Sequence, residues 1–372
     1  MQLAMIVMRP ETLPNQSRSP DGTPGPLAAG TGGAPRGFGL IRMIMVIQLL
    51  GIMVAAALLN LAQAQYLPDS AEYWWMQTED GVHHYVLNLG DSDKSEKTFV
   101  VLHGGYGAEH SYLIKPLLPL SRDYRFVLYD QRGSLRTEAP VESMVFSRMV
   151  EDLEALRQEL DLDEVGLIGH SNGAMLALDY LATHPERVSR LILLGPPLSF
   201  VHGDVFSGES LDEAIARFRS RHAELTGQVE RAIDDKLREL ELYEKSDLSG
   251  RERTIRSKVE AAAWNTVDVV NWPTMQNAFF NPGVFEALQK NVSQEAWRER
   301  SLRKSKAFVN SDRPIRIILG NSDFSDPNGH VWTVLVEEAR NGRLAIIDQA
   351  GHMPWFDQAE AFTSQLRSFL ED

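Results

Sequence analysis

The chain of 372 residues contains no cysteine. A cysteine nucleophile, a thiolate metal site and a disulfide framework are therefore excluded. The histidines include no spacing of the His-Glu-x-x-His kind, so we predict no metal site and no cofactor. We interpret five of them as surface or pocket residues: His83, His84, His110, His202 and His330.

Positive charge is also scarce. The chain has 37 Lys and Arg against 51 Asp and Glu, which gives a formal net charge of −14. Nothing in the sequence offers a basic stripe that would neutralise phosphates, so we expect no nucleic-acid partner. A small molecule or a short peptide is the expected substrate, and the sequence leaves the oligomeric state open.

The N-terminal 64 residues do not carry the pattern of a folded domain. Residues 1–37 are rich in Pro, Gly, Ser and Thr, which predicts a disordered or upstream segment. Residues 38–64 contain an uncharged apolar run that ends in Ala62-Gln63-Ala64, which predicts a signal peptide and a secreted or periplasmic protein. The alternative is a membrane anchor formed by residues 43–61, which are nearly numerous enough to span a bilayer. Either way, we expect the mature domain to begin near Gln65.

Beyond the N-terminal segment, strand patterns alternate with helical patterns. This rhythm predicts an α/β fold with a mostly parallel central sheet flanked by helices. Asp80-Gly81, between alternating apolar residues, predicts a hairpin near the start, and a helical stretch is expected near residues 112–120. We assign residues 65–197 and 313–372 to the two parts of this core.

Residues 198–312 break the rhythm. They are helical in pattern, rich in charge and too numerous for a loop. We therefore predict a helical cap inserted into the core, which would cover the site, limit substrate size and exclude water.

The pentapeptide Gly169-His170-Ser171-Asn172-Gly173 reads Gly-x-Ser-x-Gly and lies between a buried strand pattern and a helical pattern. A serine on such a turn is held in a strained, exposed position and can act as a nucleophile once a base takes its proton. His352, after Gly351 at a strand end, is the predicted base. Asp323 is the predicted acid that orients the imidazole, and Asp326 is the alternative.

The oxyanion formed during acyl transfer needs backbone N–H donors. Asn172, directly after the nucleophile, is one predicted donor. Gly105, in the glycine-rich loop after the strand 98–102, is the predicted second donor. Tyr106 is the alternative to Gly105, and its side chain could instead line the substrate pocket.

Five motifs together resemble the α/β-hydrolase superfamily: His103-Gly-Gly105, Asp130-Gln-Arg-Gly133, Gly169-His-Ser-Asn-Gly173, Asp323 and Gly351-His352. The first two of them resemble its proline iminopeptidase branch. The resemblance implies an α/β-hydrolase fold, a Ser-His-Asp triad and an acyl-enzyme. Members of that branch remove an N-terminal residue, often proline, from short peptides, and acidic cap residues hold the free amine. Glu260 and Asp268 are the candidates here, with Trp264 and Trp272 beside them as further substrate-binding candidates.

Two positions depart from the branch. Asn172 stands where the branch usually has Trp, and Tyr106 stands where it usually has Pro. Neither departure touches the predicted triad. From the motifs, the first prediction is a proline-iminopeptidase-like aminopeptidase acting on small peptides or amides. A carboxylesterase or lactonase acting on small esters is the alternative within enzymes. A non-catalytic binding protein that retained the fold is the alternative from another class.

Overall fold

The computed structural model describes residues 71–91, 97–275 and 280–372. All of them belong to one compact unit, Leu67–Asp372. The predicted segments 1–37 and 38–64, with their signal peptide or anchor, lie outside the described residues, so both readings stay predictions. None of the helices in the described part of the chain is long and apolar enough to cross a membrane.

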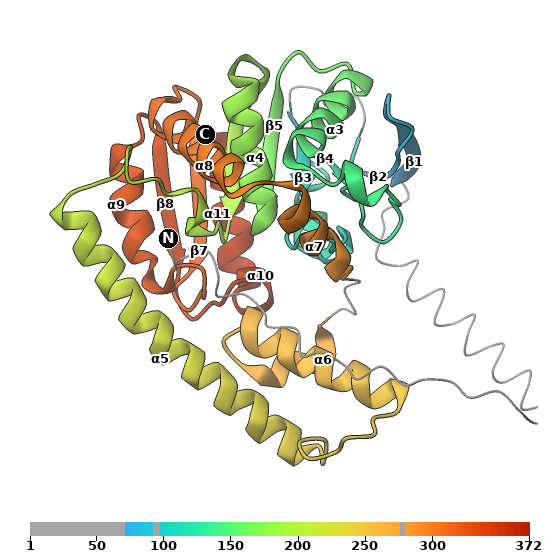
Figure 1. Cartoon of the computed structure of the whole chain (residues 1–372), viewed down its shortest axis with the longest axis vertical. Coiled ribbons are helices and arrows are strands. Elements are labelled where there is room, and N and C mark those ends of the chain that lie inside the picture. Colours follow the sequence, from blue (N-terminus) through green and yellow to red (C-terminus); the bar gives the residue numbers. More distant parts are fainter. Residues whose placement is uncertain (1–70, 92–96, 276–279) are drawn as a thin grey trace, which may run out of the picture. The chain divides into compact units, whose positions relative to one another are not determined.

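The eight strands of the described chain form a single sheet in the order β1-β2-β4-β3-β5-β6-β7-β8 (Figure 1). The pairs β1–β2 and β2–β4 are antiparallel, and all other neighbours are parallel. The predicted hairpin and the predicted mostly parallel sheet are thus confirmed. The strands are β1 Glu72–Gln77, β2 His83–Leu89, β3 Thr98–Leu102, β4 Arg125–Tyr129, β5 Val165–His170, β6 Val188–Leu194, β7 Ile315–Gly320 and β8 Gly342–Ile347.

Both faces of the sheet are buried, because successive side chains of a strand point to opposite faces. In β3, Val100 and Leu102 pack into the cluster that includes α3, α4 and α9. Phe99 and Val101 pack into the opposite cluster, which includes α2 and α11. The core helices are α2 Ile114–Leu117, α3 Phe146–Glu159, α4 Asn172–Thr183, α9 His330–Glu338, α10 Pro354–Asp357 and α11 Ala359–Glu371.

The segment between β6 and β7, here called the inserted segment (residues 198–312), is mostly helical in its described residues. It contains α5 Glu209–Glu239, α6 Gly250–Asn265, the 3₁₀ helix η7 Val269–Thr274, α7 Pro282–Asn291 and α8 Gln294–Asn310. In Figure 1, α5 runs from the side of α9 towards α6. Helix α6 begins with a capping box, in which Ser249 and Glu252 exchange side-chain and backbone hydrogen bonds.

The stretch predicted as a helix near residues 112–120 is divided into three short pieces. These are a 3₁₀ turn at Ser111–Leu113, α2 and a second 3₁₀ turn at Leu118–Leu120. Pro119 stands in the first turn of the last piece, where its missing N–H cannot continue the helix from α2.

Candidate active site

Ser171 lies on the turn between β5 and α4, with φ 53° and ψ −121°. This backbone conformation is strained for a residue with a side chain, as expected for a serine presented above the end of a sheet. The Ser171 N–H donates to the carbonyl of Leu194 at 2.8 Å, which fixes the turn to the neighbouring strand β6. Ser171 as a whole is partly exposed.

His352 and Asp323 form a direct, buried pair. The Nδ1–H of His352 donates to Oδ1 of Asp323 at 2.8 Å, with exposed fractions of 3% and 0%. Burial alone would raise the pKa of Asp323, but the charge and hydrogen bond of His352 and the amide of Ser325 hold it below its usual value. The carboxylate therefore remains ionised and fixes the imidazole tautomer with Nε2 free to accept a proton.

Gly195, directly after β6, provides the space in which this pair meets. Its φ is +53°, and a Cβ atom there would lie 2.8 Å from both Oδ2 of Asp323 and Nδ1 of His352. Only glycine fits this position without moving the pair.

Asp326, the alternative acid, occupies a different environment. Its Oδ2 accepts the N–H groups of Val331 and Trp332 at 2.9 and 2.7 Å at the start of α9. Burial raises its pKa to about 7, and the charge of Asp323 adds to this rise. Asp326 thus serves the start of a helix, and the carboxylate that reaches His352 belongs to Asp323.

The glycine-rich loop after β3 lies against the nucleophile turn. A Cβ atom at Gly104 would lie 2.8 Å from Cβ of Ser171. The N–H of Gly104 already donates to the hydroxyl oxygen of Tyr112 at 2.6 Å, so Gly105 and Tyr106 stay the candidate oxyanion donors of this loop. Asn172 opens α4, where the first amides of a helix have no partner within the helix.

The buried side chain of His103 forms hydrogen bonds that hold this loop. Its Nδ1–H donates to the Gly104 carbonyl at 3.1 Å, and its Nε2 accepts the N–H of Gln131 at 3.1 Å. Burial lowers the pKa of His103 to about 4, so the ring stays neutral and keeps both bonds.

His170, the residue before Ser171, connects three loops of the site. Its Nδ1 accepts the hydroxyl of Tyr112 at 2.7 Å, and its Nε2–H donates to the carbonyl of His352 at 3.3 Å. Burial first, and then the proximity of His352, lower the pKa of His170 well below its usual value, which keeps the ring neutral. The chain Gly104–Tyr112–His170–His352 therefore links the glycine loop, the nucleophile turn and the histidine loop.

The imidazole of His352 also packs against aromatic rings. Phe324, directly after Asp323, lies 4.3 Å from it between ring centroids. Trp264 of α6 packs edge to face against Phe324, with 5.9 Å between the ring centroids. A predicted substrate-binding residue is thus one ring away from the predicted base.

The other predicted substrate-binding residues differ in their surroundings. Asp268 accepts the Val270 N–H at 2.8 Å and caps η7. Trp272 packs into a small cluster of the inserted segment around Val259. The ring of Tyr106 stacks on Phe285 at 6.1 Å, and Glu260 is exposed on α6.

The interpretation of the histidines as surface or pocket residues is wrong for His84, His110 and His202, which are buried. His84 lies 3.3 Å from Asp152, and Nδ1 of His110 lies 2.7 Å from Asp130, so buried carboxylates explain the positions of His84 and His110. His110, Asp130 and Glu109 lie close enough together to hold a metal ion. Arg136, however, already pairs with both carboxylates, at 3.0 Å each, which supplies the positive charge a cation would bring.

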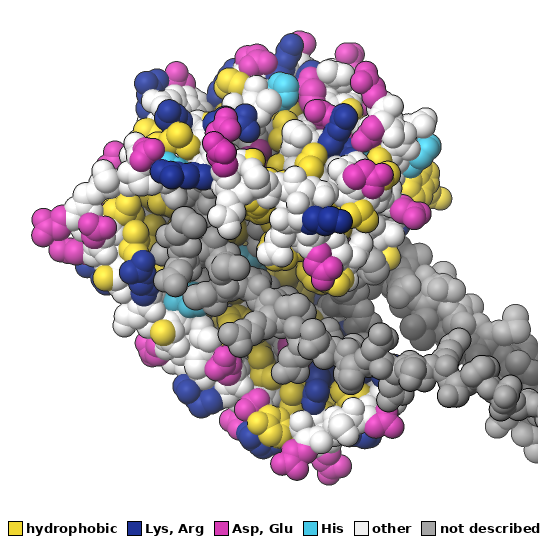
Figure 2. All heavy atoms as spheres, in the orientation of Figure 1, with side chains coloured by type: hydrophobic (Ala, Val, Ile, Leu, Met, Phe, Trp, Pro, Cys, Tyr) yellow, Lys and Arg dark blue, Asp and Glu magenta, His cyan; other side chains and the backbone are white. Residues whose placement is uncertain are grey.

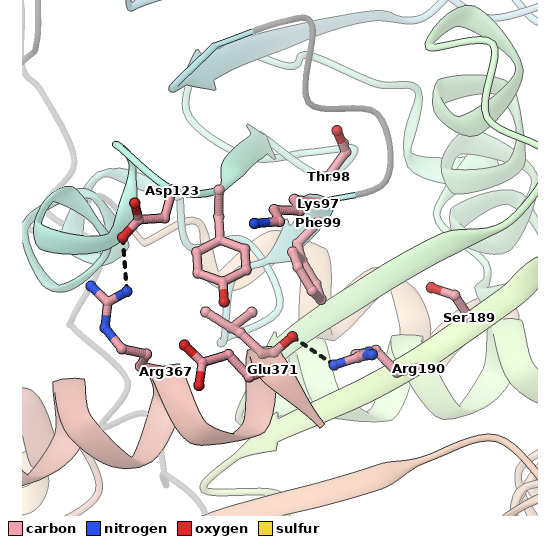
Figure 3. Close-up of a pocket in the computed structure, with 10 residues that line it drawn as sticks. Lys97, Thr98, Phe99, Asp123, Ser189, Arg190, Arg367 and Glu371 are labelled. Atoms are coloured by element: carbon pink, nitrogen blue, oxygen red, sulfur yellow. Dashed lines mark hydrogen bonds and ion pairs between the residues drawn. The ribbon is translucent and has the colours of Figure 1, made fainter.

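A pocket of about 630 Å³ lies at the opposite edge of the sheet, where β3, β4 and β6 begin (Figure 3). Arg367 in its wall pairs with Asp123 at 2.8 Å, and Arg190 donates to the last carbonyls of α11, including that of Leu370 at 2.7 Å. Ser171, Asp323 and His352 follow the carboxyl ends of β5, β7 and β8, so this pocket lies at the other end of the strands. On the face shown in Figure 2, Lys and Arg side chains lie singly among Asp and Glu, with no basic stripe.

The comparisons with known proteins agree with this geometry. Residues 97–359 match the family model described as "alpha/beta hydrolase fold". The chain belongs to this family.

The curated relatives include proline iminopeptidases. That of Heyndrickxia coagulans is 40% identical over 102 residues, 27% of this chain and 35% of that protein. The probable proline iminopeptidase of Streptomyces coelicolor is 27% identical over 305 residues, 76% of this chain and 90% of that protein. The chain spans between 35% and 46% of the length of the first three curated relatives that it matches.

Among solved structures, a proline iminopeptidase-related protein from Thermus thermophilus has a TM-score of 0.56 at 21% identity. The match covers 81% of this chain and 97% of that one, and it supports the fold. The predicted α/β-hydrolase fold, the hydrolase class and the resemblance to the proline iminopeptidase branch are thus confirmed.

Four residues of the site were not predicted from the sequence: Tyr112, His170, Phe324 and Asp357, whose carboxylate accepts the Gly351 N–H beside His352. His170 and Phe324 adjoin predicted residues in the chain, which was a usable signal. Tyr112 and Asp357 reach the site only through folding, and no local motif marks them.

Proposed function

We propose that the chain is a serine hydrolase that works through an acyl-enzyme on Ser171, and that it acts as a proline-iminopeptidase-like aminopeptidase on small peptides or amides. The buried Asp323–His352 hydrogen bond carries this proposal, since it supplies an oriented base. The ring of that base lies 4.8 Å from the ring of His170, the residue before the strained Ser171. The inserted segment would act as the cap over this site.

In this mechanism, Oγ of Ser171 attacks the substrate carbonyl carbon while Nε2 of His352 takes the hydroxyl proton. The oxyanion accepts N–H groups from Gly105 and Asn172. As the tetrahedral intermediate collapses, His352 gives its proton to the leaving amine. A water molecule, deprotonated by the same nitrogen, then attacks the acyl carbon and releases Ser171.

The substrate's free amine needs a carboxylate. Asp268 already caps η7, which leaves Glu260 as the favoured candidate. Glu260 and Trp264 are four residues apart on α6 and so share a face of the helix. Because Trp264 packs against Phe324 beside His352, this face is oriented towards the site.

The test compares prolyl-p-nitroanilide with p-nitrophenyl butyrate, using the full chain and its Ser171→Ala variant. We expect serine-dependent cleavage with the anilide strongly preferred, and a higher KM for the anilide alone in Glu260→Gln. Turnover of the ester alone, lost in Ser171→Ala, would instead favour the carboxylesterase or lactonase that the same triad supports. Absence of serine-dependent turnover with both substrates would contradict the specificity proposed here.

A further inference from the structure

The loop that carries His352 is bonded to the inserted segment directly on one side and through Asp357 of α10 on the other. On one side, the Met353 N–H donates to the carbonyl of Asn265, the last residue of α6, at 2.8 Å. On the other side, the Gly351 N–H donates to Oδ2 of Asp357 at 2.9 Å. The proposed base therefore lies between two anchored amides.

The carboxylate of Asp357 extends the second bond to the inserted segment. It accepts the Val267 N–H at 3.2 Å on Oδ1 and 3.1 Å on Oδ2. It also lies 3.5 Å from the side-chain amide of Asn271 in η7. One carboxylate thus joins the backbone of the histidine loop to the backbone that follows α6, through charge-assisted hydrogen bonds.

The two segments are also in close contact. A Cβ atom at Gly351 would lie 2.8 Å from the carbonyl oxygen of Asn265 and 3.0 Å from the backbone of Thr266. The Thr266 hydroxyl bonds the Ala262 carbonyl at 2.8 Å, which stiffens the end of α6. A displacement of this turn would therefore be transmitted to the loop of His352.

We propose that Asp357 is a positioning residue that couples the inserted segment to His352. Resting on the proposed function, this inference assigns to the inserted segment a role beyond covering the site: its α6–η7 junction holds the base where it can accept the Ser171 proton. Without the Asp357 carboxylate, the amides of Gly351 and Val267 lose their shared acceptor, and the loop of His352 is held from one side only.

The test is the rate at which a small, uncharged fluorophosphonate labels Ser171 in the full chain. This reagent reports activation of the serine without depending on contacts to a peptide. In Asp357→Ala, we expect the rate to fall on the order of 10-fold to 100-fold, as for a displaced catalytic group. With p-nitrophenyl butyrate, kcat should fall by a similar factor, while KM stays within about 3-fold of the unmodified chain, because the pocket itself is retained.

Thr274→Ala is the matched control, because it removes a side-chain hydrogen bond from the same junction that reaches the Asn271 carbonyl instead of the histidine loop. It should keep the labelling rate within about 2-fold. Amide hydrogen exchange should rise at Gly351 and Val267 in Asp357→Ala and not in Thr274→Ala. Asp357→Asn keeps one acceptor oxygen, should fall between the two and serves if the alanine variant does not fold.

Three results would overturn this role. Labelling of Asp357→Ala at the rate of the unmodified chain, with faster exchange at both amides, would leave the proposed function intact and remove the coupling. A loss of labelling shared equally by Thr274→Ala would assign the effect to general loosening of the junction. If the unmodified chain is not labelled, the proposed function fails, and the role of Asp357 fails with it.

Discussion

Nδ1 of His352 lies 2.8 Å from Oδ1 of Asp323, and Oδ2 of the same carboxylate has no hydrogen-bond partner among the described residues. The pair is buried, so the imidazolium formed during catalysis would face the carboxylate in surroundings that screen it poorly. Asp323 bonds His352, whereas Asp326, three residues further on, accepts backbone N–H groups at the start of α9.

Asp323→Asn should lower kcat on the order of 10³-fold to 10⁴-fold, because the amide would favour the wrong imidazole tautomer. Asp326→Asn should keep kcat within about 3-fold, since the amide oxygen can still accept at the start of α9. Steady-state kinetics of the two variants decide between the acids. The reverse ranking would make Asp326 the member of the triad.

Asp326 should also affect the pH dependence of stability. Its folded pKa of about 7 lies above the ordinary carboxyl value of 3.8, so the folded protein binds the proton more tightly. The contribution of this group is therefore fully present below pH 3.8 and is lost as the pH rises through 7. Denaturant unfolding at pH 5 and pH 8 should show a smaller decrease in the free energy of unfolding for Asp326→Asn than for the unmodified chain; an equal decrease would contradict this prediction.

Gly195→Ala should abolish most activity in a folded protein. Its Cβ atom would displace Asp323 or His352, and the positive φ would add strain. We expect kcat to fall at least about 100-fold. Gly203→Ala is the control, because a Cβ atom there meets nothing within 4 Å; equal losses in the two variants would refute the steric argument.

Tyr112→Phe tests the chain of bonds through His170. Removal of the Tyr112 hydroxyl group leaves the Gly104 N–H and Nδ1 of His170 without this hydrogen-bond partner. We expect kcat to fall on the order of 10-fold with little change in KM, since the glycine loop loses an anchor and the pocket keeps its shape. An unchanged kcat would show that the loop is held without Tyr112.

Lys304→Met tests a buried cation in α8. The Nζ atom of Lys304 lies 3.9 Å from Asp179, which already pairs with Arg300. Burial, and then the charge of Arg300, lower the pKa of Lys304 to about 7. The folded protein therefore binds this proton less tightly than the unfolded chain, and stability rises with pH between 7 and 10.5. The variant should be more stable at pH 6, on the order of 1 to 4 kcal/mol, with a gain that shrinks towards pH 10. A variant less stable at pH 6 would contradict this expectation.

Much of the fold could be predicted from local patterns. Strand β3 and helix α11 follow their apolar periodicity, and Asp80-Gly81 fixed the first hairpin. The break in the stretch at 112–120 depends on proline at a helix junction, which periodicity alone overlooks. The burial of His84 could not be foreseen, because its partner Asp152 is far away in the chain.

The site divides in the same way. Ser171, Asp323 and His352 could be named because each follows a strand in a fixed order, and strands of one parallel sheet end at one edge. Asp357 stands four residues beyond Met353 in an unremarkable short helix, and its contacts arise only when α6 packs on the histidine loop. Such contacts between distant segments leave no local pattern.

Ser171 is the proposed activated nucleophile, and every role assigned to the other residues of the site depends on it. The most direct measurement is peptide mass mapping after partial reaction of the full chain with a fluorophosphonate, combined with the hydrolytic activity that remains. We predict one phosphonyl group on the peptide that contains Ser171, with activity lost in proportion to its occupancy and no labelling in Ser171→Ala. Activity that persists when Ser171 is fully modified, or that is lost while the group lies on another residue, would contradict the account.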